Sequence, residues 1–232
     1  MDTSVTPRPA ATIILLRDSD AGPEVWLMER ARALGFMGAA WVFPGGRVDA
    51  EDEHVPVVGG DFGVVPRSFW AAAARELEEE AGVRLAAAGG PYELDRMALW
   101  SHWITPPVES RRYDTWFFVA RMPAGQEAGF DGREAVNGRW LRPDDAVARA
   151  LGHALPLAPP TLRSLAELSG FPDVEAILSA RRRFPPICPS FEHVGDEVWV
   201  LLPGDPAFPA PEADAVDPPT RFLFPLRGWQ AR

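Results

Sequence analysis

Apolar runs separated by turn-forming residues predict several β-strands in the first part of the chain. Residues 11–16 form an aliphatic run, residues 18–23 have the composition of a turn, and residues 24–28 again favour a strand. A β-hairpin is the simplest interpretation. A short apolar strand at 41–43 stops at Pro44. The later strand candidates are 96–104, 114–120 and 138–141.

Helical patterns alternate with these strands. Ser68 is the expected N-cap of a helix that runs through four alanines to Glu80 and is closed by Gly82. Residues 143–151 also have a helical pattern. Because strands lie on both sides of the helix that ends at Gly82, the sequence predicts a mixed α/β fold.

The pattern changes beyond Pro156. Two short helical segments are expected at 161–168 and 172–183, then a strand at 197–202 and a proline-rich stretch. We therefore divide the chain into a core at 1–155, with an insertion at about 53–67, and a C-terminal extension at 156–232. We expect the extension to pack on the core and not to form an independent domain.

Composition excludes several classes of function. The net charge of -10 argues against a nucleic-acid scaffold, since such binding depends on a basic surface. Cys188 is the single cysteine, so no disulfide within the chain and no thiolate metal cluster is expected. The N-terminal residues lack a signal-peptide pattern and no apolar run could span a bilayer, so we expect a cytoplasmic protein without a membrane partner.

The predicted helix carries a concentrated group of carboxylates. Glu76, Glu79 and Glu80 are spaced i, i+3 and i+4, which places their side chains on one helix face, while Glu78 points elsewhere. Three like charges so close repel one another, and a divalent cation would favour their ionised forms. Hard oxygen ligands suit Mg²⁺ or Mn²⁺. The alternative is a solvated helix face with an internal salt bridge, the better interpretation for an isolated acidic run.

The surroundings of this acidic run favour the metal site. Upstream lies Phe43-Pro44-Gly45-Gly46, where glycine lets the backbone turn sharply and approach a ligand closely. The stretch Arg75-Glu76-Leu77-Glu78-Glu79-Glu80-Ala81-Gly82-Val83 follows downstream. Together these pieces resemble the signature of the Nudix hydrolase superfamily. Two departures are the insertion and Asp52, which occupies the position where the usual signature has a glutamate.

Further residues narrow the resemblance. Thr105-Pro106 and the Ser-Arg-Arg-Tyr-Asp-Thr stretch at 110–115 are similar to the acyl-CoA diphosphatase branch. The resemblance implies an α/β/α sandwich with a mixed central sheet. It also implies hydrolysis of coenzyme A or acyl-CoA to phosphopantetheine, or its acylated form, and adenosine 3′,5′-bisphosphate. Two alternatives stay open: hydrolysis of another nucleoside diphosphate derivative, such as NADH, ADP-ribose or a nucleotide sugar, and a non-catalytic nucleotide-binding regulatory module.

The resemblance also implies roles for single residues. Glu79 and Glu80 are the first metal ligands, Glu76 is a third ligand or orients the attacking water, and the Gly46 carbonyl completes the set. Arg75 holds the glutamates in position. The remaining candidates are a general base, Glu109 or Glu134, and a substrate-phosphate pair, Arg111 and Arg112; the alternative for the pair is a plain surface role. A homodimer is possible by analogy.

Overall fold

The two aliphatic runs near the N-terminus form long strands at the centre of a mixed sheet. The computed structural model describes residues 5–32, 39–60, 62–210, 213–217 and 220–224. In it β1 (Arg8–Ser19) pairs antiparallel with β2 (Gly22–Arg30) and parallel with β8 (Tyr113–Arg121). The predicted hairpin is confirmed, and β7 (Met97–Ile104) pairs antiparallel with β8.

The other strands complete this sheet, whose main order is β10-β7-β8-β1-β2-β3. Two strands lie off this path: β4 is a third partner of β1, and β9 is a third partner of β2. The bounds of these shorter strands are β3 (Trp41–Val42), β4 (Gly45–Arg47), β9 (Ala135–Leu141) and β10 (Pro186–Ile187).

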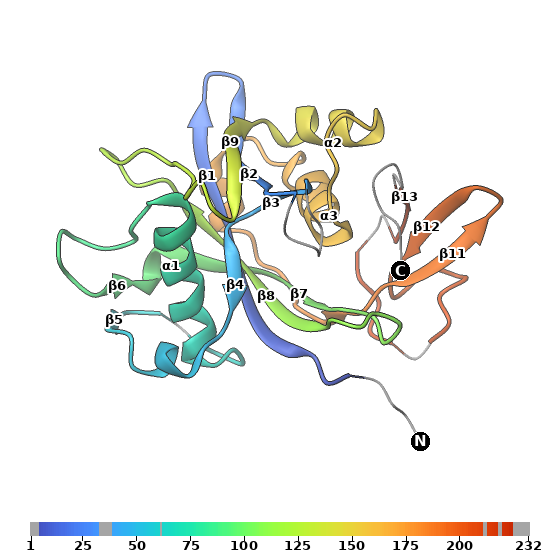
Figure 1. Ribbon diagram of the computed structural model, residues 1–232, viewed down its shortest axis with the longest axis horizontal. Helices are drawn as coiled ribbons and strands as arrows, with labels where there is room; N and C mark the ends of the chain where they lie inside the picture. Colours follow the sequence, from blue (N-terminus) through green and yellow to red (C-terminus); the bar gives the residue numbers. More distant parts are fainter. Residues whose placement is uncertain (1–4, 33–38, 61, 211–212, 218–219, 225–232) are drawn as a thin grey trace.

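Both faces of the central sheet are covered by helices. Along β1, Ile13 and Leu15 belong to the core under α1 (Arg67–Ala81), whereas Ile14 and Leu16 belong to the core on the opposite face. Burial on both faces explains why the run is aliphatic at successive positions instead of alternating with polar residues. Figure 1 shows α1 on one side of the strands, with α2 (Pro143–Leu151) and α3 (Pro159–Leu168) on the other. The predicted α/β/α sandwich is confirmed.

The helix that carries the glutamates starts earlier than predicted. Its N-cap is Pro66, whose carbonyl oxygen accepts a hydrogen bond from the Phe69 N–H at 3.1 Å. Ser68 lies inside the first turn and is buried, so its prediction as the N-cap is wrong. The predicted end is confirmed, because Gly82 adopts the left-handed conformation, at φ 68°, that closes a helix.

The insertion is folded back onto α1. It follows the 3₁₀ turn η1 (Ala50–Glu53) and contains the strand β5 (Val57–Val58). This strand pairs with β6 (Tyr92–Glu93), which lies ahead of the turn η2 (Leu94–Arg96). The Arg67 guanidinium donates to the carbonyl oxygens of Glu53, at 2.7 Å, and Val55. The predicted insertion therefore has its own backbone pairing, and the Arg67 side chain holds its first residues.

The C-terminal residues add two helices and a small second sheet. The predicted helix at 172–183 is shorter, since α4 spans Val174–Leu178. The sheet has the order β11-β12-β13 and lies on the side of α3 away from the central sheet (Figure 1). Its strands are β11 (Ser190–Val194), β12 (Glu197–Leu201) and β13 (Arg221–Phe224).

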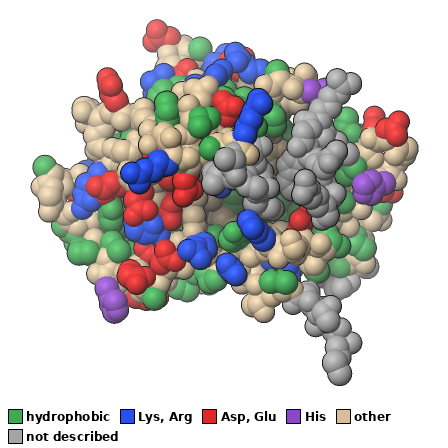
Figure 2. Space-filling view, viewed as in Figure 1, with side chains coloured by type: hydrophobic (Ala, Val, Ile, Leu, Met, Phe, Trp, Pro, Cys, Tyr) green, Lys and Arg blue, Asp and Glu red, His purple; other side chains and the backbone are tan. Residues whose placement is uncertain are grey.

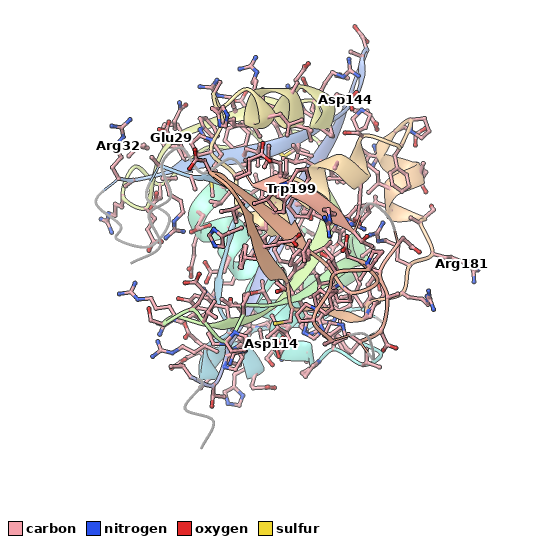
Figure 3. All side chains as sticks on the ribbon, turned by 90° about the vertical axis from the view of Figure 1, so that its right-hand side faces the viewer. Glu29, Arg32, Asp114, Asp144, Arg181 and Trp199 are labelled. Carbon is pink, nitrogen blue, oxygen red and sulfur yellow. The ribbon has the colours of Figure 1, made fainter. Side chains whose placement is uncertain are left out.

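Side chains from the two parts of the chain share one core. Leu162 and Leu165 of α3 and Val200 of β12 belong to the same buried cluster as Ile14 and Leu16 of β1. Figure 3 looks at the small sheet from its own side, where Trp199 of β12 is labelled. The division at residue 155 remains a proposal. None of the described helices is both long and apolar enough to cross a bilayer.

Candidate active site

A cavity of about 490 Å³ lies where the glutamate face of α1 meets β4 and the start of α3. Glu76, Glu79 and Glu80 all line it, as do Gly45 and Gly46. Figure 2 shows acidic and basic side chains gathered on the face over α1. The structure thus brings the two halves of the sequence signature together around one hollow.

Arg75 is the centre of the hydrogen-bond network beside this cavity. Its Nε donates to Asp52 Oδ1 at 2.8 Å and a terminal nitrogen donates to Asp52 Oδ2 at 3.1 Å. The other terminal nitrogen donates to Glu76 at 2.8 Å and to Glu79 at 3.0 Å. The hydrogen bond with Asp52 raises the pKa of Arg75 above its ordinary value. Arg75 therefore orients two of the glutamates through its planar fork.

The aspartate that replaces the signature glutamate is fully buried. Besides Arg75, Asp52 accepts a hydrogen bond from the Asp49 N–H at 2.8 Å, which fixes the start of the η1 turn. Aspartate is shorter than the glutamate of the usual signature, but Asp52 reaches Arg75 because the η1 turn places it beside the guanidinium. Its role in this structure is to hold Arg75, and it does not line the cavity.

The two glycines lie in a strand that pairs with β1. The sharp turn expected at this position is not formed by Gly45 and Gly46. Gly45 and Gly46 lie in β4 opposite Thr12 and Ala11. A Cβ on Gly46 would lie 2.4 Å from Glu76 Oε1. The Gly45 N–H donates to Glu80 Oε2 at 2.8 Å. Glycine is needed here because the strand approaches the helix carboxylates closely.

The cavity brings titratable carboxyl groups close together. The pKa of Glu80 is raised to about 8, mainly by burial and also by the charges of Glu76 and Glu134, against the lowering effect of the Gly45 N–H. Burial also raises the pKa of Glu76, against the lowering effect of Arg75. Glu78 lies outside this group and accepts a hydrogen bond from the Tyr92 hydroxyl at 2.5 Å, as its predicted direction requires. Buried carboxylates with raised pKa values are suited to a bound cation.

The donor set fits a hard divalent cation in its chemistry, although the side chains are turned to other partners. Carboxylate oxygens are available from Glu76, Glu79 and Glu80, with the Gly46 carbonyl beside them. Among the described residues no three acidic, histidine or cysteine side chains converge on one point. Arg75 holds Glu76 and Glu79, and the Gly45 N–H holds Glu80. Binding a cation therefore requires small rotations of these carboxylates.

The remaining predicted residues occupy three different places. Glu134 lines the same cavity as the helix glutamates, on a turn whose N–H groups donate to Asp131. Glu109 lines an adjoining apolar hollow. Arg112 is buried, and its guanidinium donates to the Thr105 and Val5 carbonyl oxygens at 2.9 and 2.8 Å. Arg111 is exposed beside it.

Sequence reasoning missed Arg30. This side chain lines the cavity, and its positive charge lowers the pKa of Glu80. Its Nε is buried without a hydrogen-bond partner among the described residues. The predicted strand ended at residue 28, and only its extension to Arg30 in β2 brings this guanidinium to the site. The sequence signal that could have found Arg30 is the alternation of side chains along the strand, continued two residues past its predicted end.

Comparison with known proteins identifies the family. The NUDIX domain matches residues 6–164, more than half of the chain. The chain belongs to the NUDIX domain family. Nudix hydrolases generally use divalent metal ions and act on small nucleoside diphosphate derivatives, which agrees with the carboxylate-lined cavity.

Two curated relatives and one solved structure illustrate the similarity. The acyl-coenzyme A diphosphatase NUDT19 of Xenopus laevis is 29% identical over 122 residues, covering 47% of this chain and 31% of that protein. The putative nudix hydrolase 7 of Caenorhabditis elegans is 27% identical over 228 residues, covering 85% and 73%. The crystal structure of a NUDIX hydrolase from Alicyclobacillus acidocaldarius has a TM-score of 0.68 at 24% identity, covering 76% of this chain and 97% of that chain. The Nudix chain thus aligns with about a third of the Xenopus protein, and the solved structure supports the fold.

Proposed function

We propose that this Nudix chain hydrolyses the diphosphate linkage of coenzyme A or acyl-CoA, with Mg²⁺ or Mn²⁺ as the cofactor. The products would be phosphopantetheine, or its acylated form, and adenosine 3′,5′-bisphosphate. The observation that carries the proposal is the single cavity that Glu76, Glu79, Glu80 and Glu134 line together with Gly45 and Gly46.

We assign roles to six residues of the cavity: Glu76, Glu79, Glu80, Gly46, Arg75 and Glu134, with the Gly45 N–H as a supporting donor. Glu79 and Glu80 are the first metal ligands, with Glu76 and the Gly46 carbonyl beside them. A divalent ion bound there would offset the charge of the diphosphate oxygens. Arg75 orients Glu76 and Glu79, and the Gly45 N–H orients Glu80. Glu134, which lines the same cavity, accepts the proton of the attacking water.

A second hollow supports a substrate that has a further phosphate. It has a volume of about 280 Å³, is lined by Arg8, Arg111 and Arg112, and shares Tyr113 with the glutamate cavity. Because Arg112 is engaged by carbonyl oxygens, we assign the phosphate contact to Arg8 and Arg111. Coenzyme A has such a phosphate on its ribose, whereas ADP-ribose and NADH do not. The name of the Xenopus relative, an acyl-coenzyme A diphosphatase, supports the same choice.

Product analysis tests the proposal. Purified protein with Mg²⁺ is incubated with coenzyme A, acyl-CoA, NADH, ADP-ribose and nucleotide sugars, and the products are separated and weighed by mass spectrometry. We expect phosphopantetheine products, and a loss of turnover on the order of a thousandfold in Glu79→Gln and in Glu80→Gln. Glu78→Gln is the matched control on the same helix and should stay within about twofold of the wild type.

The other outcomes separate the alternatives. Cleavage of a different diphosphate alone would keep the reaction class and remove the coenzyme A assignment. Silence across the whole panel, with tight nucleotide binding, would favour a regulatory binding module. Full activity of Glu79→Gln and Glu80→Gln would contradict the ligand assignment.

A further inference from the structure

An apolar hollow of about 150 Å³ adjoins the glutamate cavity and has no part in the proposed reaction. Aromatic and proline side chains form most of its wall. Trp103 and Phe117 come from the central sheet, Pro160 from α3, and Pro189 and Phe191 from the C-terminal residues. We call this hollow the branch, because it adjoins the glutamate cavity as a side pocket. Its wall combines residues of the core with residues of the C-terminal extension.

The branch opens into the glutamate cavity. Both hollows are lined by Tyr113, Thr115 and Phe117, together with Ala158 and Pro160. These three β8 side chains are two residues apart and so lie on one face of the sheet. The branch lies over β7 and β8, and the glutamate cavity lies over β1 and β4. Because β8 is the direct neighbour of β1 and paired strands are about 5 Å apart, the two hollows are separated by roughly one strand spacing. A group attached directly to the diphosphate could enter the branch.

The wall of the branch favours an uncharged aliphatic group. The Thr105 hydroxyl already accepts a hydrogen bond from the Tyr113 N–H at 3.0 Å. Glu109, the one carboxylate among the described residues of the wall, would repel a phosphate. A purine ring buried there would need several hydrogen-bond partners for its ring nitrogens, because unpaired buried polar atoms are costly. An aliphatic group has no such requirement.

We propose that the branch is the subsite for the branched carbons of the pantetheine arm, which carry two methyl groups and follow directly after the diphosphate. The inference rests on the proposed function and deepens it. Apolar cavities of about 150 Å³ accept a molecule the size of benzene, so the branch has room for this short carbon cluster. The acyl chain, attached at the far end of the arm, lies outside it.

Phe191 is the specificity-determining residue of this subsite. It lies on β11 opposite Val200 of β12, which in turn pairs with Phe222 of β13. Residues directly opposite one another share a face of the sheet, and in this case it is the face that packs on the core. Phe222 is therefore a matched control, because it has the same size and face but does not line the branch.

The test measures the binding of the two product halves to the full chain by calorimetry. Phe191→Ala should weaken binding of phosphopantetheine about tenfold, since two methyl groups lose their apolar contacts. It should leave binding of adenosine 3′,5′-bisphosphate within about twofold. The same tenfold loss should appear for acylated phosphopantetheine and in kcat/KM for coenzyme A. Phe222→Ala should change none of these values by more than about twofold.

Each other result overturns the inference in a recognisable way. A loss that grows with the length of the acyl chain would place that chain in the branch. A loss for adenosine 3′,5′-bisphosphate would place the base there, and no selective loss would reduce the branch to a structural wall. If the wild type neither cleaves coenzyme A nor binds either half, the proposed function fails first, and that outcome is distinct from the three above.

Discussion

At the scale of single residues, Asp52 should contribute mainly to the stability of the fold and not directly to the reaction. Its carboxylate is fully buried and makes both hydrogen bonds to the Arg75 fork. Asp52→Asn should lower the free energy of unfolding by about 2–3 kcal/mol, because it leaves one donor of Arg75 and the start of η1 without their charged partner. Urea unfolding measures this loss.

Glu79→Gln is the contrast for that experiment. Glu79 also pairs with Arg75, but its side chain is 58% exposed. Its removal should change the free energy of unfolding by less than about 0.5 kcal/mol while abolishing turnover. Equal destabilisation by Asp52→Asn and Glu79→Gln would contradict the view that Asp52 is the structural partner of Arg75.

Glu80 links metal affinity to pH. Its pKa is raised to about 8, mainly by burial, so below that pH the metal-free carboxyl holds a proton that a cation must displace. The apparent affinity for Mg²⁺ should therefore rise with pH by up to about tenfold per unit from near pH 5 to pH 8, and then level off.

Calorimetric Mg²⁺ titrations at a series of pH values check this dependence. Glu80→Gln should weaken binding and flatten the slope, while Glu78→Gln keeps the wild-type slope. An affinity for Mg²⁺ that stays constant between pH 5 and pH 8 would show that no buried proton competes with the ion.

At the scale of elements, the two glycines of β4 should fail in different ways when changed to alanine. A Cβ on Gly46 would meet the carboxylate of Glu76, the movable end of a side chain, whereas a Cβ on Gly45 would lie 2.6 Å from the Ala11 carbonyl oxygen. Gly46→Ala should lower kcat at least tenfold with little change in Tm, and Gly45→Ala should lower Tm by several degrees. Kinetics and thermal unfolding on both variants measure the difference. Similar effects in both would contradict the distinct roles of the two positions.

Local patterns predicted most of these elements correctly. The aliphatic run of β1 and the glycine at the end of α1 are strong signals, and both were confirmed. The N-cap at Ser68 was wrong because Arg67 is held by the folded insertion and the helix starts two residues earlier, with Pro66 as its N-cap. The strand at Gly45 was missed because its pairing with β1 depends on a distant segment, and glycines alone do not indicate a strand.

At the scale of the whole molecule, contacts between residues far apart in the sequence bring some residues to the cavity, and these residues could not be placed there from the sequence. The helix spacing was enough to group Glu76, Glu79 and Glu80, because residues three and four apart share a helix face. The position of Glu134 in the cavity depends on the pairing of β9 with β2, and that of Phe191 depends on a second sheet. Neither relation has a local signature in the chain.

The shared core predicts that the C-terminal residues are needed for folding. Leu162, Leu165 and Leu168 are buried against the face of the central sheet opposite α1. At about 2 kcal/mol for each buried leucine, losing all three would remove roughly 6 kcal/mol, which is comparable to the whole stability of a typical domain. A chain cut after residue 155 should therefore fail to unfold cooperatively, whereas the full chain should unfold in one calorimetric transition.

Point variants test the same core without truncation. Leu165→Ala, at a fully buried position on α3, should lower the free energy of unfolding by about 3 kcal/mol. Leu151→Ala, at a position that is 55% exposed at the end of α2, should lower it by less than about 0.5 kcal/mol. If the truncated chain gave a sharp transition and kept its turnover, residues 156–232 would form a separate unit. In that case Leu165→Ala should also leave the stability of residues 1–155 unchanged, so the two measurements check one another.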